Sequence, residues 1–422
     1  MHKKKLQKNT LGWIIYDFAD SSFVTIIVTV LYSMYFKNNV VGMGELGTAL
    51  WGRAISISML LVALTAPILG AIADYSHSKK KLLTIFAYTC VAFTSLLFFV
   101  KPGDVALGMI LFVIANFCFN SANVFYNAFL TMVASPSQIG KISGIAWGVG
   151  YLGGLVSLLI VMPVAKMHLP DFLNYRFSFL IVAAFYAVFA LPTMLWVKDE
   201  IGHVPRTMSY PQIAYSRIKD TFQNIKRYKE LVKFLFSYLL YNDGITVVIS
   251  FASIYGAQRF GMGPTEMILY FIIAQPASFI GSLIFGFLYD KIGAKKSISI
   301  TLILWILTVV WVFMCSSKTE YYFIGLAAGF VMGSSQSNSR AFFTQLTPSH
   351  KMTEFFGFYS VTGRLASIVG PLLYGEIAHQ TGNQRYAILS IVIFFILGFV
   401  FLQLVDEKKG KSNAILEISE TR

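Results

Sequence analysis

Long apolar runs separated by short polar segments make up most of this chain. The runs are roughly 20 to 26 residues long, as an α-helix needs to cross a bilayer, whereas outer-membrane barrel strands would alternate over about ten residues. The pattern therefore predicts an all-α membrane protein with twelve transmembrane helices. The expected spans are 11–36, 47–73, 82–100, 105–134, 140–165, 175–197, 231–256, 266–289, 296–316, 321–346, 353–378 and 385–405.

One long polar break divides these spans into two sets of six. It is rich in Lys and Arg and contains Pro205 and Pro211, which is typical of an exposed linker. Four parts are therefore expected along the chain. They are an N-terminal six-helix bundle at 1–197, a cytoplasmic basic linker at 198–230, a C-terminal six-helix bundle at 231–405 and a cytoplasmic tail at 406–422.

Composition supports the membrane assignment. Hydrophobic residues make up 56% of the chain and charged residues 13%, whereas soluble domains carry about 25% charged residues. The formal net charge of +14 would suit a nucleic-acid partner, but most Lys and Arg fall on segments that share one side of the membrane if the spans alternate. This distribution follows the positive-inside rule, so it places both termini in the cytoplasm and assigns the basic loops to anionic membrane lipid instead of nucleic acid.

The first span carries two acidic side chains, Asp17 and Asp20. Residues at i and i+3 project from the same face of a helix. Because a charged side chain deep in hydrocarbon costs roughly 3 kcal/mol on insertion scales, this face must meet other helices or water. The length of the run and its acids indicate a retained spanning helix and not a secretory signal.

The fourth span carries a stripe of amides. Asn116, Asn120, Asn123 and Asn127 follow one another at helical spacing and therefore share one face. Amides that faced lipid would lack hydrogen-bond partners, so the stripe is expected to face the interior of the bundle. Asn120, Asn123 and Asn127 are candidates for solute contact there, and the alternative is that the amides hold helices together.

The C-terminal half carries ionisable side chains inside its spans. Gln336 and Arg340 share a face of the tenth span, Arg364 lies near the middle of the eleventh, and Asp243 lies in the seventh. A guanidinium fork suits a carboxylate or phosphate, so both arginines are candidates for holding an anionic group of a solute. The alternative is a permanent salt bridge to the buried acids.

Aromatic and acidic side chains complete the predicted site. Tyr241 and Trp147 lie in spans and are candidates for stacking on a solute or for hydrogen bonding to it. The embedded acids outnumber the embedded arginines, so burial and mutual repulsion favour the neutral form of some of them. Asp20 and Asp243 are therefore candidates for proton exchange, and the alternatives are that they bind a cationic group or pair with the arginines.

The segments after the second and eighth spans repeat one motif. They read G-A-I-A-D-Y-S-H-S-K-K from Gly70 and G-F-L-Y-D-K-I-G-A-K-K from Gly286, which indicates duplication of a six-helix unit. Glycine permits close helix approach and an aspartate can meet the positive end of a neighbouring helix, so the motif is a candidate gate or, alternatively, a charged tight turn. The candidate gating residues are Gly70, Asp74, Gly286, Asp290, Lys291, Gly293 and Lys295.

At these residues the chain resembles the major facilitator superfamily, whose loop motif is G-x-x-x-D-[RK]-x-G-[RK]-[RK]. The copy from Gly286 fits throughout, whereas the copy from Gly70 has Tyr75 in place of the basic residue and lacks the second glycine. The W-x-x-Y-D-F-A-D-S of the first span and the Y-N-D-G of the seventh resemble the vacuole-effluxer-like branch, which contains bacterial permeases and the yeast vacuolar amino-acid effluxer. The resemblance implies a transporter of the bacterial inner membrane with two pseudo-symmetric halves.

The leading interpretation is a secondary active transporter that works by alternating access. Its solute is expected to be small, polar and anionic or zwitterionic, such as an amino acid or a similar metabolite, with protons as a possible coupling ion. A larger carboxylate-bearing chelate such as a siderophore is the alternative solute. A non-transporting membrane receptor or scaffold is the alternative from another class.

Other classes of function lack their motifs. The histidines lie at span ends or in loops without an H-E-x-x-H, and the chain has no P-loop, so neither an enzyme nor an ATP-driven pump is expected. Cys90, Cys118 and Cys315 fall in or beside apolar runs without a C-x-x-C, so they are assigned to packing. No cofactor, metal or nucleic-acid partner is expected, and nothing in the sequence requires more than a monomer.

Overall fold

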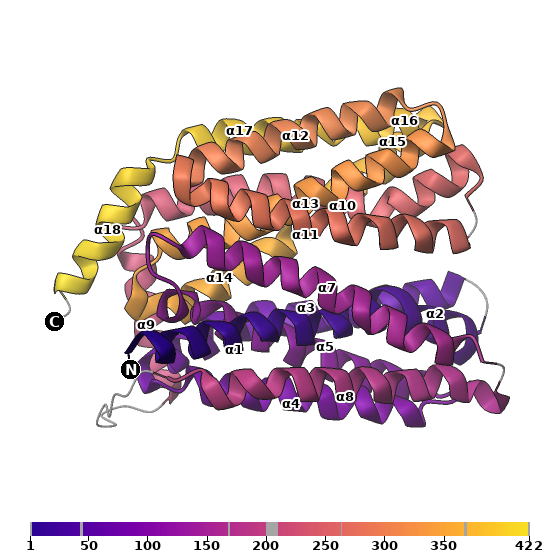
Figure 1. The fold of residues 1–422 in the computed structure, drawn as a ribbon, viewed down its shortest axis with the longest axis horizontal. Coiled ribbons are helices and arrows are strands. Elements are labelled where there is room, and N and C mark those ends of the chain that lie inside the picture. The colour runs from indigo at the N-terminus through magenta and orange to yellow at the C-terminus, as the bar shows by residue number, and fades with distance from the viewer. Residues whose placement is uncertain are drawn as a thin grey trace. The chain divides into compact units, whose positions relative to one another are not determined.

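The computed structural model describes residues 2–42, 45–167, 169–199, 210–262, 264–366 and 369–420, and all regular elements in these residues are helical. The chain forms two compact units (Figure 1). The first contains Met1–Val133 and Val149–Ser216, and the second contains Ala134–Gly148 and Arg217–Arg422. Helix α7 therefore begins in the second unit and continues in the first.

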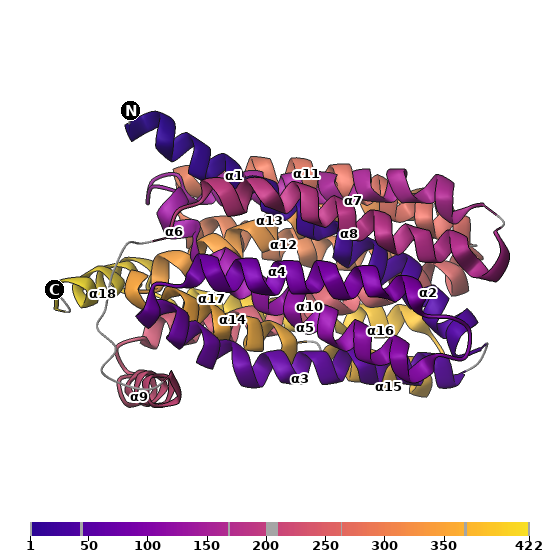
Figure 2. The same cartoon turned by 90° about the horizontal axis from the view of Figure 1, so that it is seen from below.

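The first unit is built from long helices that run beside one another (Figure 2). Helix α1 continues through two π-helical segments and a short α-helix, so that Lys8–Val40 forms one 33-residue candidate span. The elements of the first unit are α1 (His2–Ser22), η1 (Phe23–Val30), α2 (Leu31–Tyr35), η2 (Phe36–Val40), α3 (Glu45–Ser76), α4 (Lys79–Leu96), η3 (Leu97–Phe99), α5 (Val105–Ala128), α6 (Leu130–Val133), most of α7 (Ile139–Ala165), η4 (Pro170–Phe172) and α8 (Leu173–Trp196).

The second unit adds two polar helices to its apolar ones. Helix α9 (Tyr210–Gln223) precedes the bundle and ends in this unit, and α18 (Glu407–Glu420) follows it. The other elements are α10 (Lys229–Phe260), α11 (Pro264–Ile292), α12 (Ala294–Met314), α13 (Lys318–Leu346), η5 (Ser349–Lys351), α14 (Met352–Leu365), α15 (Val369–Thr381), α16 (Gln384–Ser390) and α17 (Val392–Gln403).

Ten helices within the described residues are long and apolar enough to cross a membrane, judged by length and composition. The tenth predicted span corresponds to α13, which has 29 residues but is polar from Gly333 to Arg340. The eleventh predicted span, 353–378, corresponds to α14, which ends at Leu365, and α15, which begins at Val369, with residues 367 and 368 outside the described residues. Pro371 is the third residue of α15, a position that tolerates proline because the first N–H groups of a helix have no partner within it.

An aromatic cluster joins α1, α5 and α8 in the first unit. The indole N–H of Trp13 donates to the carbonyl of Tyr126 at 2.8 Å, and the Tyr16 ring stacks on the Tyr126 ring with centroids 4.7 Å apart. The Tyr16 and Tyr186 hydroxyls share a hydrogen bond of 2.8 Å. Because buried polar groups need partners, this cluster fixes the rotation of α1 about its axis and hence the direction of its acids.

Two glycines allow α11 and α13 to pack with their backbones close together in the second unit. A Cβ atom on Gly281 of α11 would lie 2.0 Å from the Phe330 carbonyl oxygen, and one on Gly333 of α13 would lie 2.0 Å from the Ser278 carbonyl oxygen. Neither position has room for a larger residue, because backbone carbonyls cannot rotate away as side chains do. This close approach brings the polar segment of α13 into the interior of its unit.

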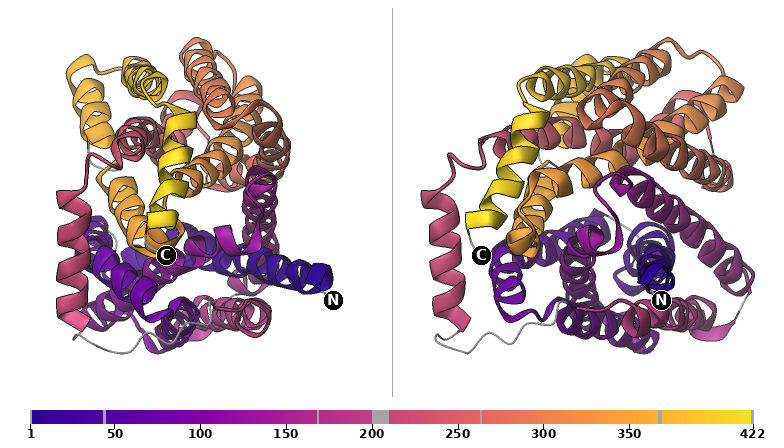
Figure 3. Two further views of the ribbon diagram at one scale, coloured as in Figure 1. Left: turned by 90° about the vertical axis from the view of Figure 1, so that its left-hand side faces the viewer. Right: turned by 60° about the vertical axis from the view of Figure 1, so that its left-hand side comes forward.

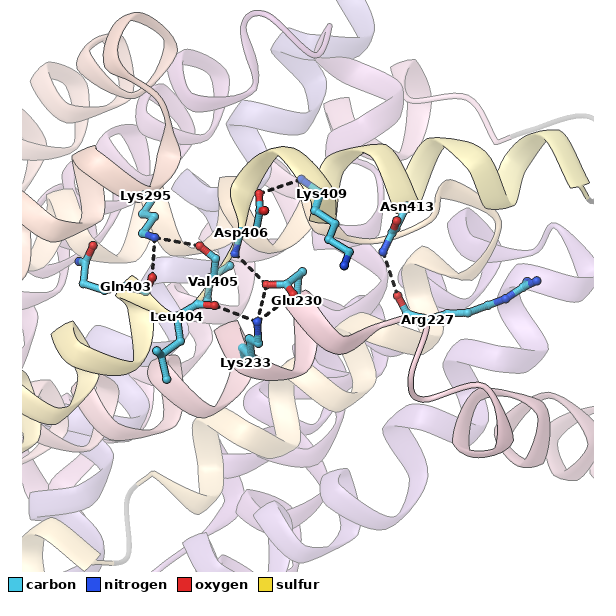
Figure 4. Close-up of polar contacts among 10 residues, drawn as sticks. All are labelled: Arg227, Glu230, Lys233, Lys295, Gln403, Leu404, Val405, Asp406, Lys409 and Asn413. Carbon is cyan, nitrogen blue, oxygen red and sulfur yellow. Dashed lines mark hydrogen bonds and ion pairs between the residues drawn. The ribbon is translucent and has the colours of Figure 1, made fainter.

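The C-terminal helix α18 crosses the ends of the bundle helices of its unit (Figure 3, left). Figure 4 shows how the turn before it is held, since the Lys295 ammonium donates to the carbonyls of Gln403 and Val405 at 2.7 and 2.9 Å. The Asp406 N–H donates to Glu230 of α10 at 2.7 Å. Glu407 accepts the N–H groups at the start of α12, Ala294 and Lys295, at 3.1 and 3.0 Å.

A buried lysine anchors the end of α9 to the start of α14. The Lys351 ammonium donates to Asp220 at 2.6 Å and to the Tyr228 hydroxyl at 3.2 Å, and the Thr221 hydroxyl donates to Glu354. The hydrogen bond from Lys351 lowers the pKa of Asp220. A carboxyl group whose pKa is lowered by folding stabilises the folded state above its unfolded pKa, and this contribution disappears as the pH falls through the folded pKa.

The close contact of α11 and α13 is tested by Gly281→Ala, with Gly52→Ala as control because a Cβ on Gly52 meets no atom within 4 Å. We expect Gly281→Ala to lower the free energy of unfolding by about 1–3 kcal/mol, the usual cost of overpacking. Thermal unfolding of the purified proteins measures the difference. Equal transition temperatures for the two variants would contradict the close packing.

The anchoring of α9 is tested by Lys351→Ala, with Lys226→Ala as control at an exposed position. We expect amide hydrogen exchange in residues 217–223 to become several-fold faster in Lys351→Ala only, because Asp220 and Tyr228 lose their common donor. In the wild type the same segment should lose protection below about pH 4, as Asp220 becomes protonated. Unchanged protection in Lys351→Ala would refute the anchor.

Candidate functional site

The most polar buried surface of the second unit lies on α13. Its serines at 334, 335, 337 and 339 and its Asn338 are each 0% exposed, and Arg340 is 3% exposed. Gln336, Ser339 and Arg340 follow one another at i, i+3 and i+4, so they share one face of the helix. The hydrogen bonds of these three side chains lead to α7 and α10.

Arg340 is held by the first turns of α7. Its Nε and Nη2 atoms donate to the hydroxyl and the carbonyl of Ser143 at 3.0 and 2.9 Å, and the Ser143 hydroxyl donates to the Ser337 carbonyl at 2.8 Å. The guanidinium also lies over the ring of Trp147, with 5.4 Å between its central carbon and the ring centroid. Serine, arginine and tryptophan therefore form one cluster, which fixes the orientation of the cation.

Helix α10 contributes a tyrosine and an amide to the same face of α13. The Tyr241 hydroxyl and the Ser339 hydroxyl are 2.7 Å apart, and Gln336 donates from its amide nitrogen to the Asn242 side-chain oxygen at 3.2 Å. The contacts of α13 with α7 and α10 thus bring Tyr241, Gln336, Arg340 and Trp147 together as one polar region within the second unit.

The next residue of α10, Asp243, points to a different helix. Its Oδ2 atom accepts the backbone N–H of Gly370, in the first turn of α15, at 2.9 Å. The residue is 1% exposed, and its Oδ1 atom has no hydrogen-bond partner among the described residues. Arg364, which the sequence suggested as a cation for this region, lies in α14, but its side chain falls outside the described residues.

In the first unit, the two acids of α1 are largely buried. Asp17 is 9% exposed and Asp20 is 5% exposed. The part of α7 that belongs to this unit passes close by, since a Cβ atom on Gly150 would lie 3.1 Å from the Asp17 carbonyl oxygen. The small residue therefore lets α7 pack directly against the turn of α1 that carries the acids.

The amides of α5 make local hydrogen bonds. Asn116 donates to the Ser58 hydroxyl of α3 at 2.7 Å, and Asn120 donates to the Asn116 carbonyl at 2.7 Å. Asn123 donates to the Phe119 carbonyl of its own helix at 3.2 Å, and Asn127 is half-buried at the end of α5. Asn116 thus joins two helices, while the amide donors of Asn120 and Asn123 turn back to their own backbone.

Asp290, in the second copy of the repeated motif, belongs to α11 and contacts the first turn of α7. Its two carboxylate oxygens accept the N–H groups of Gly140 and Lys141 at 3.0 and 2.9 Å. These N–H groups have no partner within the helix, and the positive end of the helix dipole favours a carboxylate there. Gly286 lies one turn earlier, where a Cβ atom would be 2.8 Å from the Gly140 carbonyl oxygen.

The remaining motif residues have separate surroundings. Gly293 adopts a φ of +91° at the corner between α11 and α12, which favours glycine. Lys295 binds the last carbonyls of α17 instead of approaching α7, and Lys291 is exposed. In the first copy, which begins at Gly70 in α3, Asp74 forms a buried ion pair with Lys79 of α4 at 3.0 Å.

Sequence reasoning did not identify three participants in these contacts. Ser143 binds Arg340 from a helix that is distant in the chain, and Asn242 and Gly370 contact Gln336 and Asp243. Asn242 could have been found, since it lies between Tyr241 and Asp243 in the Y-N-D-G segment. No sequence signal connects Ser143 or Gly370 to its partner.

The sequence is similar to that of known transporters. The chain matches the profile of the family described as "Vacuole effluxer Atg22 like" over residues 48–139 and 134–415. It is 28% identical to the MFS-type transporter YxiO of Bacillus subtilis (strain 168), over 96% of each chain. It is 24% identical to autophagy-related protein 22-1 of Penicillium rubens, over 88% of this chain and 77% of that protein.

The fold is also similar to a solved structure. The major facilitator superfamily transporter FucP, crystallised in the outward conformation, superposes with a TM-score of 0.71 at 14% sequence identity, and the match covers 95% of this chain and 98% of FucP. This likeness confirms the predicted fold class, an all-α membrane protein of the major facilitator type.

The contact between Asp290 and α7 is tested by Asp290→Asn. An asparagine offers one acceptor oxygen and turns an N–H₂ group toward one of the two backbone donors, so we expect several-fold faster amide exchange in residues 140–143. Asp104→Asn is the control, because Asp104 also accepts a backbone N–H, that of Lys101, at 2.9 Å. If exchange in residues 140–143 is equal in wild type and Asp290→Asn, the carboxylate does not hold this helix end.

Proposed function

We propose that this chain, which belongs to the vacuole effluxer Atg22-like family of major facilitator transporters, carries a small anionic or zwitterionic solute across the bacterial cytoplasmic membrane. As a member of that family it is a multi-pass integral membrane protein and a secondary transporter of a small molecule. The solute class we propose is an amino acid or a similar carboxylate-bearing metabolite, moved by alternating access and coupled to protons.

The observation that carries this proposal is the pair of opposite buried charges in the second unit. Arg340 and Asp243 are 3% and 1% exposed, and Asp243 is hydrogen-bonded to a backbone N–H instead of the guanidinium. A guanidinium and a carboxylate that are buried in the same unit and bind different groups are suited to the two ends of an amphoteric ligand.

In this proposal Arg340 holds the carboxylate of the solute. Its cation is oriented by Ser143 and Trp147, and Tyr241 and Gln336 supply further polar groups beside it. A guanidinium that is already oriented loses little side-chain entropy when it binds a carboxylate, which favours affinity. Arg364 is proposed as a second cation on the basis of its position in the sequence.

The first unit supplies the other polar groups of the proposal. Asp17 and Asp20 on α1 are buried acids, and Asn120, Asn123 and Asn127 line α5. We assign the acids to the ammonium group of a zwitterionic solute or to a proton, and the amides to its polar atoms. Asp20 and Asp243 are the proposed coupling residues.

Two further elements of the proposal concern gating and orientation. The bond between Asp290 and the start of α7 is proposed to form and break during the transport cycle, because α7 is the helix that both units share. The excess of basic residues on alternate loops supports a cytoplasmic location for both termini. The bacterial relative YxiO supports the cytoplasmic membrane.

The test is uptake of a labelled panel of amino acids and carboxylates into proteoliposomes, with and without a pH gradient. We expect one class of solute to accumulate when the gradient is present. Arg340→Lys should raise KM roughly tenfold or more, because a point charge replaces a bidentate fork. Arg227→Lys is the control, because it makes the same exchange at an exposed position outside the proposed site.

Asp243→Asn separates coupling from binding. We expect this variant to lose accumulation driven by the pH gradient and to keep solute counterflow, which requires no net proton movement. Transport by Arg340→Lys and Asp243→Asn at wild-type KM and with wild-type gradient dependence would refute the site. Uptake of only uncharged solutes would refute the solute class.

A further inference from the structure

The contact between Asp243 and Gly370 joins two helices through one buried hydrogen bond. Asp243 belongs to α10, and Gly370 is the second residue of α15. The Gly370 N–H occupies Oδ2 of the carboxyl group at 2.9 Å, while Oδ1 is buried without a hydrogen-bond partner in the part of the chain that the structure describes. Among the described residues, Oδ1 is therefore the carboxyl oxygen at which no donor competes with a proton.

A side chain at position 370 would crowd this contact. A Cβ atom on residue 370 would lie 2.7 Å from Oδ1 of Asp243 and 2.5 Å from Cγ2 of Val247. Gly375, farther along the same helix, is a matched control because a Cβ atom there would meet nothing within 4 Å.

The described charged groups on the surrounding helices are exposed or bond to groups other than Asp243. Arg340 of α13 binds Ser143, Glu376 of α15 is exposed and accepts from Gln380, and α17 contains no titratable side chain. The Arg364 side chain of α14 lies outside the described residues. Among the described residues of α10, α11 and α18, Glu230 pairs with Lys233, Glu266 with Lys318 and Glu407 with Lys411, and Asp290 binds the start of α7. Lys229, Arg259 and Lys291 are exposed.

Starting from the proposed role of Asp243 in proton exchange, we propose that Gly370 is the positioning residue of this acid and that proton binding on Oδ1 releases the first turn of α15 from α10. An N–H donor binds a carboxylate about twice as strongly as a neutral acceptor. The positive end of α15 favours the ionised form in the same way. Protonation weakens the hydrogen bond and removes the charge that the helix end favours, so the protonation state of Asp243 determines how tightly the first turn of α15 is held to α10.

Hydrogen exchange tests this junction without a known solute. In wild type, the protection factors of residues 370–373, corrected for the intrinsic effect of pH, should fall several-fold when the pH is lowered from about 8 to about 5, because a protonated carboxyl group binds the Gly370 N–H less strongly. In Asp243→Asn they should be low and independent of pH. Protection that does not depend on pH in wild type, or that keeps its pH dependence in Asp243→Asn, would overturn the inference.

The pH profile of transport tests the positioning role. Gly370→Ala displaces the start of α15 and removes the N–H donor from the ionised carboxylate, so we expect the pH midpoint of proton-driven uptake to rise by about one unit, the loss of one hydrogen bond to a charged group. Gly375→Ala should keep the wild-type midpoint. An unchanged midpoint in Gly370→Ala would also overturn the inference.

The outcomes distinguish this inference from the proposed function. If Asp243→Asn abolishes proton-driven uptake while Gly370→Ala keeps the wild-type midpoint, the coupling role stands and the positioning role fails. If Asp243→Asn keeps proton-driven uptake, the coupling role fails. Hydrogen exchange of wild type and Asp243→Asn shows whether protonation of Asp243 loosens the contact between α10 and α15, even if Gly370→Ala does not fold or no solute is found.

Discussion

The structure depends on how carboxylates are stabilised in an apolar protein. Three of them are stabilised by the N–H groups at the start of a helix. Asp290 binds the first N–H groups of α7, Glu407 binds those of α12, and Asp243 binds one at the start of α15. The first turn of a helix presents N–H groups without internal partners and a partial positive charge. Each acid therefore binds backbone N–H groups that the helix already holds in place, so no long side chain has to be ordered to stabilise the carboxylate.

The three acids differ in what their bonds connect. Glu407 ties the C-terminal helix to the bundle of its own unit, and Lys295 and Glu230 reinforce the same corner (Figure 4). Asp290 fixes the beginning of α7, whose later residues belong to the other unit. Asp243 is the most deeply buried of the three, and one of its oxygens has no donor within the described part of the chain. The same type of contact, a carboxylate at a helix N-terminus, thus ties α18 to the bundle at Glu407 and suits a reversible contact at Asp243.

Close packing of small residues makes the polar interior possible. Gly281 and Gly333 bring α11 and α13 together, so that the serines of α13 are fully buried and bond to carbonyls of their own helix. Ser143 then occupies two donors of Arg340, and the arginine is oriented before any ligand arrives. Packing, hydrogen bonding and the proposed binding chemistry are therefore properties of the same few helix faces.

Apolar runs and spaced polar residues were enough to predict the helical membrane fold, because hydrocarbon requires every backbone group to be paired within a helix. Residue types also indicated Asp243, Arg340 and the repeated motif, since an ion in a span needs an explanation. The sequence could not show that Arg340 is held by Ser143, that Lys295 binds α17 while Asp290 binds α7, or that Asp243 binds Gly370. Those choices depend on which helices lie within hydrogen-bonding distance, and only tertiary packing brings residues so distant in the chain together.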